Sequence, residues 1–89
     1  MITLYLHLGN DVVVKMSDVV GIFDLEKISI SKYTKSFLSS ATKNNLVTNV
    51  SYEMPKSFVV CNHSKYNKNE TRVYISQISC ATLQKRAYG

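Results

Sequence analysis

Residues 51–61 read SYEMPKSFVVC, in which a proline and a lysine separate two runs that are otherwise typical of β-strands. Proline has no backbone N–H, and a strand inside a sheet must donate one to its neighbour. Pro55 therefore belongs in a connection or at a sheet edge. The sequence predicts strands over 46–52 and 57–61, with Glu53–Lys56 between them, and this connection exposes the basic side chain of Lys56.

Three further strand patterns lie toward the N-terminus. Residues 2–8 alternate between apolar and polar side chains, which is the pattern of a half-buried strand. Residues 9–11 read GND, a turn sequence tolerant of positive φ, and a second strand follows at 12–14 to complete a hairpin. After a turn at 17–18, the β-branched and aromatic residues at 19–25 predict a third strand.

Between residues 29 and 43 the hydrophobic period becomes that of a helix. At about 100° per residue, one side carries apolar residues, namely Ile30, Tyr33, Phe37 and Ala41, and we expect Tyr33 to complete the packing there. The opposite side is a basic outer stripe made of Lys32, Lys35, Ser36, Ser39 and Lys43. Ser29 and Ser31 are both suitable N-caps, and Asn44-Asn45 is a suitable stop.

Residues 62–70 are polar throughout and predict an exposed loop. A last strand follows at 71–76. Ser79 is a suitable cap for a final helix at 80–87, and its last turn holds Lys85 and Arg86, where cations suit the helix dipole. The order predicts an α+β fold: a mostly antiparallel sheet of about six strands, one amphipathic helix after the third strand and a C-terminal helix.

A chain of 89 residues suits a single domain over 1–89. Because so small a core supplies little surplus stability, we expect copies of the chain to bury apolar surface against one another. No apolar run approaches the roughly 20 residues of a membrane span, and the N-terminus lacks a signal-peptide pattern. We therefore expect a cytoplasmic protein that does not bind membranes and whose cysteines, Cys61 and Cys80, stay reduced.

Catalytic and metal-binding motifs are absent from the sequence. The candidate ligands His7, His63, Cys61 and Cys80 lack the paired short spacings of structural zinc, and Cys61-Asn62-His63 is the nearest approach. The acids form no recognisable catalytic motif, and the glycines are too scattered for a phosphate loop. The sequence predicts a non-enzymatic protein without a cofactor, a metal or a small-molecule substrate.

The net charge of +5 is distributed unevenly along the chain. Acids dominate up to Glu26, whereas no acid occurs between Glu26 and Glu53 or after Glu70. Basic side chains on one surface neutralise the phosphates of a nucleic acid and give affinity without sequence information. The candidates for such contacts are Lys32, Lys35, Lys43, Lys56, Arg72, Lys85 and Arg86.

Several stretches that follow one another over nearly the whole chain carry a family resemblance. They are YLHLG at 5–9, VVGIFD at 19–24, PKSFVV at 55–60, YISQIS at 74–79, and Thr82-Leu83 with Lys85-Arg86-Ala87. Together they resemble the small bacterial regulators of extracellular matrix genes, the RemA/RemB family, and especially its RemB branch. The resemblance implies a cytosolic, non-enzymatic, DNA-binding regulator of biofilm matrix expression, with RemA-branch relatives assembling as rings of identical subunits.

The chain departs from the RemA branch at positions that the resemblance links to DNA. RemA-branch proteins carry a run of arginines before the strand that corresponds to 58–60, whereas this chain has Glu53-Met54-Pro55-Lys56 there. A further basic position of that branch is Asp18 in this chain. Arginine binds phosphate bidentately, whereas a single lysine acts as a point charge.

Two hypotheses follow. In the first, a homo-oligomer contacts the backbone of double-stranded DNA through the basic candidates, and repeated weak contacts add through effective concentration. In the second, an oligomer of this chain, or of this chain with a related subunit, regulates through protein contacts and binds DNA weakly or not at all. Glu53 and Asp18 favour the second.

Overall fold

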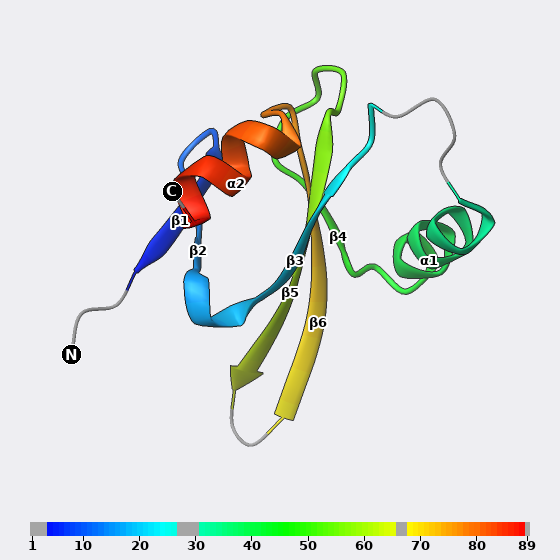
Figure 1. The fold of residues 1–89 in the computed structure, drawn as a ribbon. Helices are drawn as coiled ribbons and strands as arrows, with labels where there is room; N and C mark the ends of the chain where they lie inside the picture. The colour runs from blue at the N-terminus through cyan, green and yellow to red at the C-terminus, as the bar shows by residue number, and fades with distance from the viewer. Residues whose placement is uncertain (1–3, 27–30, 66–67, 89) are drawn as a thin grey trace.

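The structure is a computed structural model that describes residues 4–26, 31–65 and 68–88. Its elements are β1 (Tyr5–Gly9), β2 (Val12–Lys15), the 3-10 turn η1 (Met16–Asp18), β3 (Val19–Asp24), α1 (Lys32–Lys43), β4 (Val47–Asn49), β5 (Ser57–Lys65), β6 (Lys68–Ser76) and α2 (Cys80–Tyr88) (Figure 1). The α+β class is confirmed. The described strands divide between a two-stranded sheet, β1-β2, and a four-stranded sheet in the order β3-β5-β6-β4.

The chain crosses from β4 to β5 at Pro55, as its missing N–H requires. The next residue already joins the four-stranded sheet, because the Lys56 N–H donates to the Ser76 carbonyl at 2.9 Å. The strand predicted at 46–52 is shorter, since only Val47–Asn49 pairs, in parallel with β6. The pairings of β3 with β5 and of β5 with β6 are antiparallel.

Different elements cover the two faces of the four-stranded sheet (Figure 1). Side chains alternate along β5, so its neighbouring residues contribute to different cores. On the hairpin face, the β1-β2 hairpin and α2 surround Val59 and Cys61 with the buried residues Leu6, Leu8, Val14 and Leu83. On the opposite α1 face, the buried core consists of Ala41, Phe58, Val60 and Val73.

Residues 62–65 and 68–70 continue the β5-β6 hairpin instead of forming a loop, so the prediction of a loop is wrong for these residues. β5 and β6 pair as far as Lys65 with Lys68. Most of the described side chains in this part are exposed. Alternating hydrophobicity marks a strand only when one of its faces is buried. The sequence of a ribbon with both faces in solvent is polar throughout and therefore looks like that of a loop.

The outer part of this hairpin stands free of the other strands. β3 pairs with β5 only as far as Cys61, and β4 pairs with β6 only from Val73 onward. Residues 62–65 and 68–71 therefore form a two-stranded ribbon, here called the arm. It projects beyond both helices in Figure 1.

Helix α1 begins and ends close to the predicted signals. The Ser31 hydroxyl caps it by accepting from the Thr34 N–H at 3.1 Å, and Asn45 takes the left-handed conformation after its end with φ 57°. Ser29 and Ile30 lie outside the described residues. Of the predicted apolar side, Ala41 is buried, but Tyr33 is 88% exposed, so the expected packing of Tyr33 is wrong.

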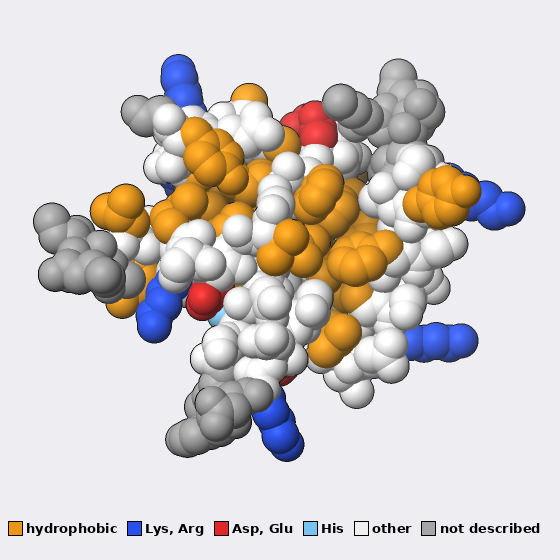
Figure 2. All heavy atoms as spheres, turned by 60° about the horizontal axis from the view of Figure 1, so that its bottom comes forward, with side chains coloured by type: hydrophobic (Ala, Val, Ile, Leu, Met, Phe, Trp, Pro, Cys, Tyr) orange, Lys and Arg blue, Asp and Glu red, His pale blue; other side chains and the backbone are white. Residues whose placement is uncertain are grey.

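Hydrophobic side chains also remain at the surface. With the arm turned toward the viewer, they gather near the middle of the visible face, while Lys and Arg side chains project from its margin (Figure 2). No helix within the described residues is long and apolar enough to cross a membrane.

Candidate nucleic-acid interface

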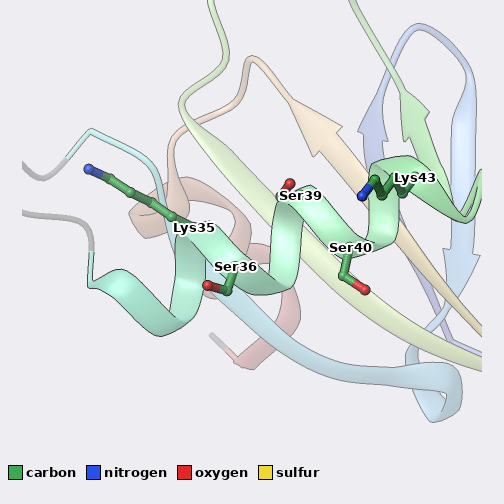
Figure 3. A pocket seen from close by; sticks show the side chains of 5 residues that line it. All are labelled: Lys35, Ser36, Ser39, Ser40 and Lys43. Carbon is green, nitrogen blue, oxygen red and sulfur yellow. The ribbon is translucent and has the colours of Figure 1, made fainter.

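The outward side of α1 carries a basic and hydroxyl-rich surface. A shallow hollow along it is lined by Lys35, Ser36, Ser39, Ser40 and Lys43, here called the Lys–Ser face. Figure 3 shows the two lysines at opposite ends of a row of serines. At about 1.5 Å per residue, the backbone positions of Lys35 and Lys43 are about 12 Å apart along the helix. Lys32 is exposed on the same helix, one turn before Lys35.

The composition of this surface matches the chemistry of a phosphate backbone. Ammonium groups and hydroxyls donate hydrogen bonds to phosphate oxygens, and no acid occurs anywhere in α1 to oppose them. The structure thus brings together Lys35 and Lys43, two of the residues that the sequence nominated.

Lys56 lies apart from the Lys–Ser face. It is exposed beside a hollow that it lines together with Leu25, Glu26, Met54 and Pro55, none of which contributes to the Lys–Ser face. The carboxylate of Glu26 shares this hollow. Within one subunit, Lys56 therefore lies beside an acid and does not contribute to the Lys–Ser face.

Arg72 is engaged within the chain. Its Nη2 lies 2.9 Å from Glu70 Oε1, and its Nη1 donates to Thr48 Oγ1 at 3.1 Å. Both members of the ion pair are partly exposed, so the pair is screened by solvent. A phosphate would have to compete with Glu70 for this guanidinium.

Lys85 and Arg86 occupy the last turn of α2, as predicted from the C-terminal pattern. Arg86 Nη1 donates to the His7 carbonyl at 3.4 Å, which places it over the β1-β2 hairpin. Helix α2 packs on the hairpin face of the four-stranded sheet, whereas α1 packs on the other face. Within one subunit, the cations of α2 and those of the Lys–Ser face therefore lie in different layers.

A side-chain network at the base of the arm escaped the sequence analysis. His63 Nδ1 lies 2.9 Å from Asp18 Oδ2, and His63 Nε2 lies 2.9 Å from the Tyr74 hydroxyl. Burial raises the pKa of the Tyr74 hydroxyl. The network joins η1, β5 and β6. Asp18 and His63 are 45 residues apart in the sequence, a separation at which no local motif signals a contact.

The thiol of Cys61, beside this network, has low reactivity. Burial raises the pKa of Cys61 to about 11, and the negative charge of Asp18 adds to the effect. The thiol is therefore protonated near neutral pH and is a poor nucleophile and a poor metal ligand. No group of three or more His, Cys, Asp or Glu side chains within the described ranges is arranged to hold a metal ion.

An apolar groove lies between α1 and the edge strand β3. It has a volume of about 320 Å³ and is lined by Val20, Phe23, Tyr33, Thr34, Phe37, Phe58 and Val60. The rings of Phe23 and Phe58 stack at 4.9 Å between centroids and form its floor. Val20, at 67% exposure, and Tyr33 form exposed parts of its wall.

On the other side of the molecule, the outer side of the β1-β2 hairpin mixes exposed apolar and polar side chains, because Tyr5 lies opposite Lys15 and Val13 lies opposite His7. Tyr5 and Val13 are exposed on β1 and β2, on the side of this hairpin that points away from its buried residues Leu6 and Val14. Leu4, just before β1, is 66% exposed. The apolar groove and the outer side of the hairpin belong to the two opposite outer layers of the chain.

Comparisons with known proteins give one consistent result. A family model described as RemA-like, "Extracellular matrix regulatory protein A-like", matches residues 5–87. The chain is 39% identical over 84 residues to "Extracellular matrix regulatory protein B" of Bacillus subtilis (strain 168). That alignment covers 94% of this chain and 90% of the relative.

Proposed function

Because this chain belongs to the RemA-like family of extracellular matrix regulatory proteins, we propose that it is a DNA-binding transcriptional regulator of extracellular matrix genes. It acts in the cytoplasm as a homo-oligomer without catalytic activity. It contacts the phosphate backbone of double-stranded DNA through basic side chains. The observation that carries the proposal is the Lys–Ser face, which presents two ammonium groups and three hydroxyls on a helix without acids.

One subunit supplies too few of these contacts for firm binding. Each phosphate neutralised by a lysine releases counterions, and Lys35 and Lys43 provide two such contacts at most. Copies of the chain on one duplex add their contacts through effective concentration. The α2 cations and the α1 cations lie in different layers of one subunit. Assembly can bring the α2 cations of one subunit beside the α1 cations of its neighbour.

Two surfaces with exposed apolar side chains support such an assembly. The groove beside α1 and the exposed side of the β1-β2 hairpin lie in opposite layers, so a contact between them is heterologous. Repetition of a heterologous contact closes a ring when the rotation between subunits allows it, and otherwise produces a filament.

The test is a titration of duplex DNA over a salt series with wild-type protein and the Lys35→Ala/Lys43→Ala variant. The logarithm of the association constant falls with the logarithm of salt by about 0.9 per phosphate contact. We expect the variant to bind more weakly and with a shallower slope, by up to about 1.8 for each subunit on the duplex. Gln84→Ala, which removes an exposed uncharged side chain from α2, is the control. Assembled protein that binds no duplex at low salt contradicts the proposal.

A second candidate function is regulation by protein contact with little DNA binding. It is favoured by Asp18, whose carboxylate is committed to His63, and by Glu53 in the connection before Lys56. It predicts absent or salt-insensitive DNA binding by a protein that still assembles through its apolar groove.

A further inference from the structure

The arm has the dimensions of a DNA-reading ribbon. It contains four cross-strand pairs, from Asn62 with Thr71 to Lys65 with Lys68. At about 3.3 Å per residue these pairs extend about 13 Å beyond the sheet, on strands about 4.8 Å apart. The major groove of B-DNA is about 12 Å wide and about 8.5 Å deep and admits a two-stranded ribbon of this kind.

One face of the arm is uncharged and unused by the fold. Cross-strand partners share a face, so Asn62 and Thr71 lie on the same side as Ser64 and Asn69. All of these side chains are exposed, and none makes a hydrogen bond to another described residue. Two amides and two hydroxyls are thus held on a regular backbone with their donors and acceptors available.

The other face of the arm is fixed by intramolecular contacts. His63 bridges Asp18 and Tyr74 with polar contacts of 2.9 Å each, and Glu70 pairs with Arg72 just below the arm. These contacts anchor the arm to η1 and to the sheet. The arm therefore projects in a defined direction, with its amide and hydroxyl face turned outward.

The chemistry of the free face fits base edges. Asparagine binds adenine bidentately at N6 and N7, and serine and threonine hydroxyls donate to or accept from any base. No carboxylate on this face repels phosphate, and Lys68 is exposed near the end of the arm. This face continues the α1 side of the sheet, because residues 62 and 64 alternate with the same period as Val60. Helix α1, which carries the Lys–Ser face, and the free face of the arm thus lie on the same side of the sheet.

We propose that the arm enters the major groove of duplex DNA and that Asn62, Ser64, Asn69 and Thr71 read base edges there. The inference rests on the proposed DNA-binding function and adds the source of its sequence preference. The basic surface supplies affinity, and the arm supplies selectivity.

The experiment compares wild type with Asn62→Ala/Asn69→Ala in a selection from a randomised duplex library, followed by titrations with the selected site and with a scrambled duplex. We expect the wild type to select a motif. The arm variant should lose at least about 10-fold of the preference for the selected site over the scrambled one. Its salt slope on scrambled DNA should stay unchanged, because no phosphate contact is removed. Gln84→Ala, an exposed amide on α2, is the control and should keep the preference.

Three outcomes overturn the inference while DNA binding stands. The first is an unchanged preference for the selected site in the arm variant. The second is a wild-type protein that binds duplex without selecting any motif. The third is a changed assembled mass of the arm variant, which would show that the arm contacts another subunit. The thermal unfolding of each variant is measured first, and equal midpoints exclude a folding defect. A wild-type protein that binds no duplex at all overturns the proposed function, and the inference with it.

Discussion

His63 Nδ1 lies 2.9 Å from the carboxylate of Asp18, and this contact ties the base of the arm to the turn that precedes β3. The carboxylate accepts from Nδ1–H, which leaves Nε2 to share a hydrogen bond with the Tyr74 hydroxyl at 2.9 Å. The side chains of His63 and Asp18 are 28% and 23% exposed, so solvent weakens their interaction less than it would at a fully exposed site. Position 18 therefore serves the internal structure of this chain.

Asp18→Ala should loosen the arm. The substitution leaves the ring of His63 without its acceptor, and a lost hydrogen bond of this kind lowers the free energy of unfolding by about 1 kcal/mol. Denaturant titration measures that change, and hydrogen exchange locates it in the amides of β5 and β6. Asp18→Asn keeps an acceptor oxygen, so its free energy of unfolding should lie between those of the wild type and Asp18→Ala. Glu26→Ala removes an exposed carboxylate and is the control. Unchanged exchange in the arm of Asp18→Ala would refute the anchoring role.

Local backbone chemistry made part of this fold predictable. Pro55 had to interrupt a strand, Ser31 could cap a helix, and Asn45 could take positive φ after it, and each residue does so. These outcomes depend on the residue itself and on neighbours within one turn. The same holds for the cations in the last turn of α2.

The arm and the exposed groove were beyond such reasoning for two physical reasons. A hydrophobic period shows that a helix has an apolar side, but not whether that side faces its own core or another molecule, and Tyr33 illustrates the difference. The pairing of His63 with Asp18 depends on the register of three elements, which no local pattern specifies. Of the Lys–Ser face, the helical period identified Lys35, Ser36, Ser39 and Lys43 as one side of the helix, and only Ser40 was not predicted.

The titration of Cys61 should make the protein less stable at alkaline pH. The thiol has an ordinary pKa of 9.0, which burial raises to about 11 in the folded state. Between these values the unfolded chain binds fewer protons than the folded chain, so the free energy of unfolding falls as pH rises. Below pH 9.0 this contribution is fully present. Denaturant titrations across this window should show a fall of up to about 1.4 kcal/mol per pH unit from this group.

Cys61→Ala tests the assignment of that slope. The variant should retain only the part due to other groups, including Tyr74, whose raised pKa acts in the same direction. Val59→Ala removes buried volume from the same strand without removing a titratable group, so it should be less stable at every pH but keep the wild-type slope. An equal slope in wild type and Cys61→Ala would show that Cys61 does not contribute.

Tyr33→Lys should reduce the assembled mass. Tyr33 is 88% exposed on the wall of the apolar groove, so the substitution hardly affects folding but places a charge where a second subunit would bury apolar surface. Light scattering after size exclusion measures the mass. Tyr52→Lys introduces the same charge on a tyrosine that is 98% exposed outside the groove, and should leave the mass unchanged. If Tyr33→Lys assembles as the wild type does, the groove is not a subunit contact.

Ser31→Ala should destabilise α1 and, through it, weaken the Lys–Ser face. The Ser31 hydroxyl accepts from the Thr34 N–H at 3.1 Å, and loss of an N-cap of this type lowers stability by about 1 kcal/mol. Because Lys35 and Lys43 depend on the helix for their alignment, duplex affinity should fall together with helix content measured by circular dichroism. Ser39→Ala removes a hydroxyl from the middle of the same helix and should leave its stability nearly unchanged, since alanine is a good helix former. Wild-type helix content in Ser31→Ala would show that the cap does not determine the stability of α1.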